Sequence, residues 1–197
     1  FDHYQERFWG GIGPDTASNF FNDFREDIKL MKAAGLKSIR TSIQWSRLID
    51  DLEKNTVNEK AVDFYNAVIN EFIAQGIRPM INLNHFDLPV ELLKTYGGWE
   101  SRHVVDLYAG FAAKCFAEFS DRVSDWFTFN EPMVVVECAY LLGFHYPDIV
   151  DGKKAVQVAY HLQLASSLAI EQYRKINKNP EGRIGIILNL TPSYPAT

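Results

Sequence analysis

A pattern of helix, glycine and strand occurs twice in the chain and limits the folds that are open to it. The first copy is residues 31–40, MKAAGLKSIR, and the second is residues 72–81, FIAQGIRPMI. In each copy a helix-forming stretch ends at a glycine, and a β-branched or apolar run follows at once. Gly35 and Gly76 stand where the chain leaves a helix with a positive φ, which glycine adopts without strain. Because the two glycines are 41 residues apart, the sequence predicts a repeated unit of one helix and one strand.

Four amphipathic helices are predicted from apolar residues that recur every three or four positions. Their apolar faces comprise, in chain order, Phe20, Phe24, Ile28 and Met31; Val62, Tyr65, Ile69, Phe72 and Ile73; Val104, Tyr108, Phe111, Cys115 and Phe119; and Ala155, Val158, Ala159, Leu162, Ala165 and Ala169. Side chains that can accept a hydrogen bond from the first turn precede three of these helices. The candidate caps are Thr16 or Ser18, Asn58, and Ser101.

Short apolar strands are predicted between the helices, at about residues 38–43, 79–84, 125–130 and 183–190. These runs are too continuous for a half-solvated sheet, so we expect the strands to be buried on both faces. Buried strands that alternate with helices indicate a parallel sheet, in either a closed (β/α) barrel or a doubly wound fold. A doubly wound fold usually carries a glycine-rich phosphate loop after its first strand, and the chain has no such loop. The barrel is therefore favoured.

Polar side chains gather where the predicted strands end, and this is the catalytic face of a (β/α) barrel. They are Arg40 and Ser42; Asn82, Asn84, His85 and Asp87; and Asn130 and Glu131. Only about four strands are predicted, whereas a closed barrel has eight and typically about 250 residues. The predicted fold is therefore α/β, a partial (β/α)8 TIM barrel of about four βα units, with residues 1–197 as the incomplete N-terminal part of a single catalytic domain. Such a piece exposes strand edges, so we expect it to need the remainder for stability.

The tetrapeptide Phe129-Asn130-Glu131-Pro132 places a carboxyl group at the end of a buried strand. An ionised carboxylate loses several kcal/mol of solvation in apolar surroundings, so burial favours the neutral acid. A glutamic acid that is neutral near pH 7 can protonate a leaving group, which is the first half of glycosidic bond cleavage. A structural interpretation also stays open, in which Pro132 ends the strand and the polar pair caps a loop.

The charge, the length of the apolar runs and the cysteines limit the partners and the compartment that the sequence predicts. The formal net charge is −5 and there is no run of lysine or arginine, so we expect neither nucleic acid nor anionic lipid as a partner. No apolar run approaches the roughly 18 to 20 residues of a membrane span. Cys115 and Cys138 lack Cys-x-x-Cys spacing, and two free structural thiols fit a reducing compartment, the cytoplasm. Because the chain starts at Phe1 rather than Met, we expect residues upstream of it.

Four motifs occur in a fixed order along the chain: RTSIQWSR at 40–47, HFDLP at 85–89, YGGW at 96–99 and TFNEP at 128–132. Together they resemble glycoside hydrolase family 1 over nearly the whole chain. The resemblance implies a (β/α)8 barrel and a retaining β-glycosidase that acts on a small-molecule glycoside. It also implies that the reaction needs neither a cofactor nor a metal ion.

The same resemblance implies roles for four residues. Glu131 corresponds to the general acid/base, and Asn130 to the side chain that hydrogen-bonds the 2-hydroxyl of the sugar. His85 corresponds to a sugar-binding histidine. Arg40 corresponds to an arginine beneath the site that supports the nucleophile electrostatically.

The second carboxylate of a retaining glycosidase is missing from the sequence. Retaining hydrolysis needs it roughly 5 to 5.5 Å from the first, and the family supplies it from a Glu-Asn-Gly motif, which this chain lacks. Glu137 is a poor substitute because on a helix it would point about 120° away from Glu131. Asp87 is expected to bond a loop instead. We therefore expect a truncated barrel that is inactive by itself.

Other candidate residues have structural interpretations that the sequence favours. His161 lies on a predicted helix face and is expected to be a packing histidine. A metal site at His85 is disfavoured because partners with suitable spacing are absent. Trp45, Trp99 and Trp126 are expected in the core rather than as platforms for sugar rings.

The substrate class is predicted mainly from residues that follow the second predicted strand. Many family members that cleave free β-glucosides have Trp where this chain has Phe86. The tripeptide His85-Phe86-Asp87 and the GGIGP lead-in at residues 10–14 are similar to the corresponding segments of bacterial 6-phospho-β-glucosidases. The predicted function is retaining hydrolysis of 6-phospho-β-glucosides in the cytoplasm. The alternatives are a β-glucosidase or β-galactosidase for unphosphorylated glycosides, a cellulase-like barrel that shares Asn-Glu-Pro, and a non-catalytic sugar-binding barrel.

Overall fold

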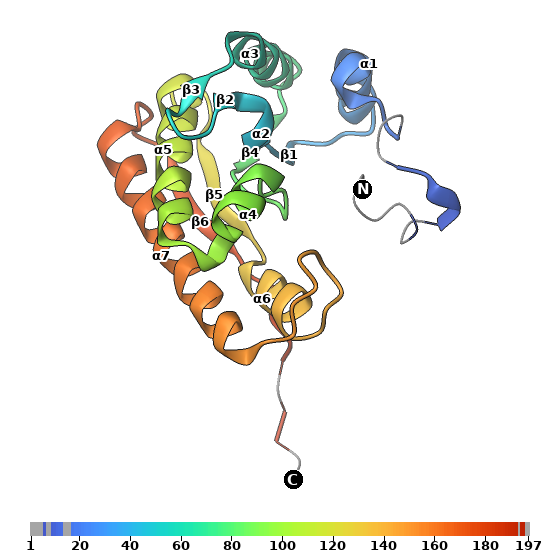
Figure 1. Cartoon of the computed structure of the whole chain (residues 1–197). Coiled ribbons are helices and arrows are strands. Elements are labelled where there is room, and N and C mark those ends of the chain that lie inside the picture. The colour runs from blue at the N-terminus through green and yellow to red at the C-terminus, as the bar shows by residue number, and fades with distance from the viewer. Residues whose placement is uncertain (1–5, 7–8, 14–16, 193, 196–197) are drawn as a thin grey trace.

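The computed structural model describes residues 6, 9–13, 17–192 and 194–195, so the candidate cap Thr16 and Pro14 of the lead-in lie outside the described residues. Helical segments separate the longer strands along the chain (Figure 1). In order they are η2 (Trp9–Gly11), α1 (Phe20–Ala33), β1 (Ser38–Ser42), α2 (Trp45–Leu48), β2 (Ile49–Asp51), β3 (Thr56–Val57), α3 (Glu59–Ala74), β4 (Arg78–Asn82), α4 (Val90–Tyr96), η3 (Gly98–Glu100), α5 (Arg102–Phe119), β5 (Asp125–Asn130), α6 (Pro132–Tyr140), α7 (Gly152–Ile176) and β6 (Arg183–Ile187).

Four parallel strands form one sheet in the order β1, β4, β5, β6, which is also their order in the chain. A doubly wound sheet reverses its direction of growth, and this sheet does not. Figure 1 shows α5 and α7 side by side along one face of β5 and β6, and α7 contacts both strands. The predicted parallel α/β architecture is confirmed, and the strand order is that of a barrel.

The ends of the helices follow the predicted glycine and cap signals at most positions. Gly35 has φ 85° and Gly76 has φ 70°, as the repeated pattern predicted. The Asn58 side chain accepts a hydrogen bond from the backbone N–H of Ala61 at 2.9 Å, so the predicted cap of α3 is confirmed. Ser101 is the N-cap residue of α5, but its side chain makes no capping hydrogen bond. Ser18 does not cap α1. The N-cap is Asn19 in a left-handed conformation, and its side chain makes no capping hydrogen bond.

The prediction that all four strands are buried on both faces is wrong for the outer two. Most residues of β4 and β5 are buried, whereas no residue of β1 or β6 is fully buried. The reason is that β1 and β6 form the two edges of the sheet and each pairs with a single neighbour. Strand β6 also ends at Ile187, before the predicted position 190. These half-exposed edges agree with an incomplete barrel.

The three tryptophans with predicted core positions are buried, as expected. Trp45 is 1% exposed, and its ring stacks on Phe111 with centroids 5.2 Å apart and an interplanar angle of 11°. Trp126 donates through Nε1 to the carbonyl oxygen of Val123 at 3.1 Å. The Trp99 ring packs edge-on against the rings of Tyr108 and Phe129. None of these indole rings is free to stack on a sugar in this structure.

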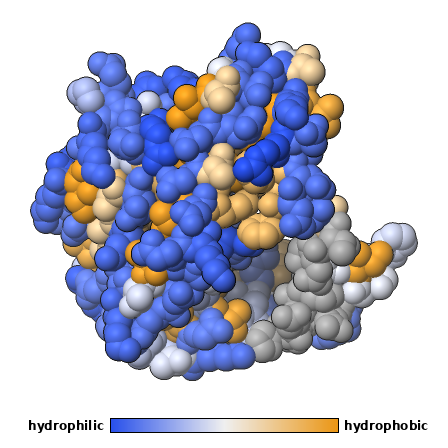
Figure 2. All heavy atoms as spheres, turned by 90° about the horizontal axis from the view of Figure 1, so that it is seen from above, coloured by the Kyte–Doolittle hydropathy of each residue, from blue (hydrophilic) through white to orange (hydrophobic). Residues whose placement is uncertain are grey.

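An ion-pair cluster ties three strands together at the end where they begin. Asp125 on β5 lies 2.7 Å from Nη2 of Arg183 on β6 and 3.4 Å from Nε of Arg78 on β4. The Asp125 side chain is only 8% exposed, while the two arginines are more than half exposed. Water therefore screens the pairs, and their main effect is to align the strand starts. The surface seen from above relative to Figure 1 is mostly hydrophilic, with hydrophobic patches among the hydrophilic residues (Figure 2).

The two cysteines are free thiols, as predicted. Cys115 is fully buried in α5, and burial raises the pKa of its thiol well above the usual value. Its unreactive protonated form is therefore favoured. Within the described ranges, none of the helices has the length and apolar character needed to cross a membrane.

Candidate active site

Arg40 and Asn130 meet at the open face of the sheet although 90 residues separate them in the chain. The Arg40 guanidinium donates from Nη1 to Oδ1 of Asn130 at 2.7 Å. Arg40 comes from β1 and Asn130 from the end of β5, and strand β4 lies between them. The bond therefore reaches over β4 and brings together two of the four residues that the family resemblance singled out.

A β-bulge in β5 turns Asn130 toward Arg40. Phe127 pairs with Gly185 and Asn130 pairs with Ile187, so β5 has one residue more than β6 over this stretch. The two residues of the bulge, Thr128 and Phe129, both point toward the helices. The Thr128 hydroxyl lies 2.7 Å from that of Ser166 on α7, and the Phe129 ring packs on aromatic rings of the helical layer. Asn130 consequently faces the opposite side, as bulges beside active sites commonly arrange.

Glu131 follows the strand in a strained turn. Its backbone has φ 46° and ψ 59°, the left-handed region that non-glycine residues seldom occupy and that concentrates at functional sites. Its N–H donates to the carbonyl oxygen of Ile187 at 2.9 Å, and Pro132 begins α6 directly after it. Glu131 is half-buried and lies just beyond the end of the buried strand, at the position that the sequence predicted.

His85 leaves the neighbouring strand end beside Glu131. The Asn130 N–H donates to the carbonyl oxygen of Asn84 at 2.9 Å, so His85 and Glu131 each follow a residue of this pair. The His85 side chain is exposed at the open face. Its ring lies 5.4 Å from that of Phe86, which has a left-handed φ of 67°.

Asp87 holds this turn, as the sequence predicted for it. Its Oδ1 accepts a hydrogen bond from the backbone N–H of His85 at 2.8 Å. Burial raises the pKa of the Asp87 carboxyl, and the hydrogen bonds that it accepts offset only part of that effect. The ionised form of Asp87 is therefore disfavoured by the folded state.

The Asp87 environment predicts a specific pH dependence of stability. A carboxyl whose pKa is higher in the folded than in the unfolded state stabilises the fold below the unfolded value, about 3.9, and this stabilisation is lost as pH rises through the folded value. We expect Asp87→Asn to match the wild type near pH 3.5 and to be more stable at pH 7. Urea unfolding of the wild type and of Asp87→Asn at pH 3.5 and at pH 7 measures the difference in their free energies of unfolding. A variant that is less stable than wild type at pH 7 would contradict the prediction.

The remaining candidates lie away from this cluster or are occupied by packing. Glu137 is exposed on α6. His161 is buried, with Nδ1 2.8 Å from the carbonyl oxygen of Trp99 and Nε2 2.8 Å from the Gln157 amide, so the predicted packing role is confirmed. In the part of the chain that the structure covers, no group of three or more His, Cys, Asp and Glu side chains could hold a metal ion.

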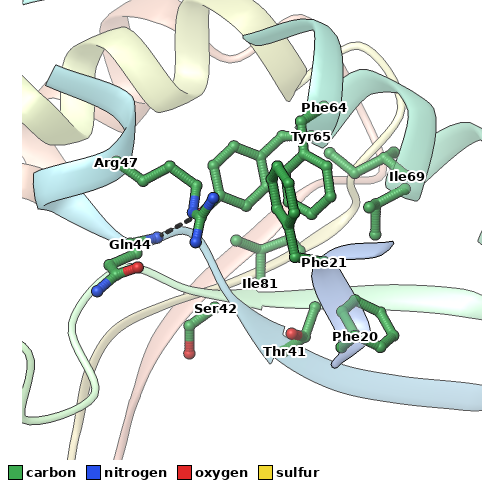
Figure 3. A pocket seen from close by; sticks show the side chains of 11 residues that line it. Phe20, Phe21, Thr41, Ser42, Gln44, Arg47, Phe64, Tyr65, Ile69 and Ile81 are labelled. Atoms are coloured by element: carbon green, nitrogen blue, oxygen red, sulfur yellow. Dashed lines mark hydrogen bonds between the residues drawn. The ribbon is translucent and has the colours of Figure 1, made fainter. Parts of the chain in front are cut away.

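A hollow of about 240 Å³ lies on the helical side of β1 and not at this cluster (Figure 3). Thr41 and Ile81 line it, and both point to the face opposite Arg40 because side chains alternate along a strand. The Arg47 guanidinium lies over the ring of Phe21 at 4.6 Å, and the backbone N–H of Gln44 donates to the Tyr65 hydroxyl at 2.9 Å. We assign this hollow to the packing between α1 and α3.

The structure brings together the predicted residues but adds one feature that the sequence did not indicate. Strict alternation along β5 would place Asn130 on the same face as Trp126 and Thr128. The bulge reverses this, and nothing in the local sequence of β5 marks its position. The contacts that hold it come from α5 and α7, which are distant in the chain.

Known proteins share both the sequence and the fold. The family Glycosyl hydrolase family 1 matches residues 1–197. The chain is 52% identical to the 6-phospho-beta-glucosidase GmuD of Bacillus subtilis over 195 residues, which are 99% of this chain and 41% of the relative. It is 39% identical to a 6-phospho-beta-galactosidase of Clostridium acetobutylicum over 189 residues, 95% of this chain and 39% of the relative.

Among solved structures, a family 1 β-glucosidase from Thermotoga maritima superposes with a TM-score of 0.92 at 34% identity. The match covers 100% of this chain and 44% of that one. The chain therefore spans about two fifths of the length of the proteins it matches. The sequence, the strand order and the superposition agree: the chain belongs to glycosyl hydrolase family 1, and its fold is part of a (β/α)8 barrel.

Proposed function

We propose that the protein containing this chain hydrolyses β-glycosidic bonds with retention, and that its substrates are 6-phospho-β-glucosides. The observation that carries the reaction is the Asn130-Glu131 turn, which a bulge and the Arg40 contact hold at the ends of parallel strands. The 52% identity to a 6-phospho-beta-glucosidase supports the substrate class. The family match favours this reaction over that of a cellulase-like barrel from another family.

In the proposed mechanism Glu131 donates a proton in the first step and takes up a proton in the second. As a neutral acid it transfers its proton to the glycosidic oxygen while the C–O bond breaks and the bonding electrons pass to the leaving group. A second carboxylate, supplied from outside these 197 residues, attacks the anomeric carbon and forms a covalent glycosyl intermediate. Glu131, now ionised, then takes a proton from the water that cleaves this intermediate.

The other residues of the cluster bind and orient in this proposal. Asn130 hydrogen-bonds the sugar 2-hydroxyl, and His85 binds a further hydroxyl group. Arg40 fixes the Asn130 amide through its oxygen and supplies positive charge near the attacking carboxylate. The domain is a single (β/α)8 barrel of which residues 1–197 form the N-terminal part, and the 197 residues alone are inactive. We place the protein in the cytoplasm, where phosphorylated sugars occur and free thiols persist.

Turnover of paired substrates tests the proposal. With the whole protein we expect kcat/KM for p-nitrophenyl β-glucoside 6-phosphate to exceed that for the unphosphorylated compound by roughly 10²-fold or more, because charged groups that bind the phosphate would be left unpaired without it. The 6-phospho-β-galactoside serves as the control for the sugar. Faster cleavage of the unphosphorylated glucoside would identify a β-glucosidase. Binding of these sugars without turnover of any would identify a sugar-binding barrel.

A further inference from the structure

Tyr108 contacts both residues of the bulge, Thr128 and Phe129, from the helical side of the sheet. It lies on α5 and is fully buried. Its hydroxyl donates to the carbonyl oxygen of Thr128, and its ring stacks on that of Phe129 with centroids 4.8 Å apart and an interplanar angle of 27°. One side chain therefore holds the backbone of the first bulge residue and the side chain of the second.

The bulge needs such a partner because it interrupts the ladder. A bulge leaves one residue of the strand without regular pairing, and a buried carbonyl group without a hydrogen bond costs free energy. Tyr108 supplies a donor to the carbonyl oxygen of the first bulge residue, Thr128. Burial raises the pKa of its phenol well above the usual value, so the hydroxyl keeps its proton across the working range of pH.

A second anchor holds the bulge from α7. The Thr128 hydroxyl lies 2.7 Å from the hydroxyl of Ser166 and 3.3 Å from the carbonyl oxygen of Gly185 on β6. Thr128 is thus fixed by two helices and the neighbouring strand. Only Asn130 separates the bulge from Glu131, and Arg40 holds the Asn130 amide from the other side. A shift of Phe129 therefore changes the direction in which the Glu131 carboxyl group leaves the strand.

We infer that Tyr108 is a positioning residue, which aims the carboxyl group of Glu131 by holding the Thr128–Phe129 bulge. The inference rests on the proposed function, because it assigns the consequence to proton donation by Glu131. Tyr108 is fully buried, so its effect on the site passes through the strand residues that it holds. Proton transfer depends steeply on geometry, and a misplacement of about 1 Å can cost roughly 10²-fold in rate.

The dependence of kcat/KM on the leaving group distinguishes a loss of Glu131 positioning from a general loss of stability. A poor leaving group, such as the sugar of a phosphorylated disaccharide, must be protonated as it departs, whereas a dinitrophenolate departs without protonation. In the whole protein we expect Tyr108→Phe, which keeps the ring and removes the hydroxyl, to lower kcat/KM for the disaccharide by roughly 10- to 10²-fold. Its kcat/KM for the dinitrophenyl glycoside should stay within about twofold of wild type.

Tyr173→Phe is the matched control. Tyr173 is also a buried tyrosine on a helix that packs against the sheet, but among the described residues its hydroxyl has no hydrogen-bond partner. We expect both substrates to be cleaved within about twofold of the wild-type rate. Should Tyr108→Phe fail to fold, Ser166→Ala removes the other anchor of Thr128, and we expect a loss confined to the poor leaving group.

The outcomes separate the two proposals. An equal loss on both substrates, or no loss on either, would overturn the positioning role while leaving the glycosidase function intact. If the wild-type protein cleaves neither substrate, the proposed function falls, and the role of Tyr108 falls with it.

Discussion

Replacing Glu131 with Gln in the whole protein is expected to lower kcat/KM for glycosides with poor leaving groups by roughly 10²- to 10⁴-fold, the usual contribution of general acid catalysis. This loss corresponds to about 3 to 5.5 kcal/mol of transition-state stabilisation. The amide keeps the shape of the acid but has no proton to donate at neutral pH. The left-handed turn at Glu131 is a backbone feature, so the substitution leaves it in place.

A glycoside with a good leaving group shows whether the loss comes from proton donation by Glu131. A dinitrophenyl glycoside needs no acid, so we expect its first step to proceed and the second to stall, because Gln cannot activate water. A burst of dinitrophenol followed by slow turnover is the expected signal in stopped-flow absorbance. Glu137→Gln, an exposed site on α6, serves as the control and should retain wild-type kinetics. Wild-type cleavage of a phosphorylated disaccharide by Glu131→Gln would remove this residue from the acid role.

Replacing Trp45 with Ala is expected to reduce the free energy of unfolding by about 3 to 5 kcal/mol, the usual cost of such a truncation in a core. The indole is 1% exposed, stacked on Phe111 and packed edge-on against Tyr108. Since domains are stable by only about 5 to 15 kcal/mol, the loss would be a large part of the total. Urea unfolding followed by circular dichroism measures it.

Trp45→Phe separates packing from hydrogen bonding at this position. In the portion that the structure describes, the indole Nε1 is buried without a hydrogen-bond partner. Phe removes this unpaired donor and keeps most of the ring, so we expect it to cost clearly less than Ala. Equal costs for the two variants would contradict the assignment of Trp45 to the stacked core.

Local signals in the sequence were sufficient to predict most of the elements. Gly35 and Gly76 end their helices with positive φ, and Asn58 caps α3 with its side chain. These outcomes depend on the conformational preference of one residue and on hydrogen bonds within one turn. The short helices η2, α2, α4, η3 and α6 and the β2–β3 hairpin were not predicted, because each is too short to show a clear periodic pattern.

The family and the chemical character of the candidate site were also determined by the sequence alone, since four ordered motifs carry them. Only the tertiary structure decided how the site is assembled. The bond between Arg40 and Asn130 and the exposure of β1 and β6 depend on which strands are neighbours. The bulge that turns Asn130 toward Arg40 depends on contacts from α5 and α7. Local preferences act within a few residues, whereas strand register and side-chain direction are set by packing between segments far apart in the chain.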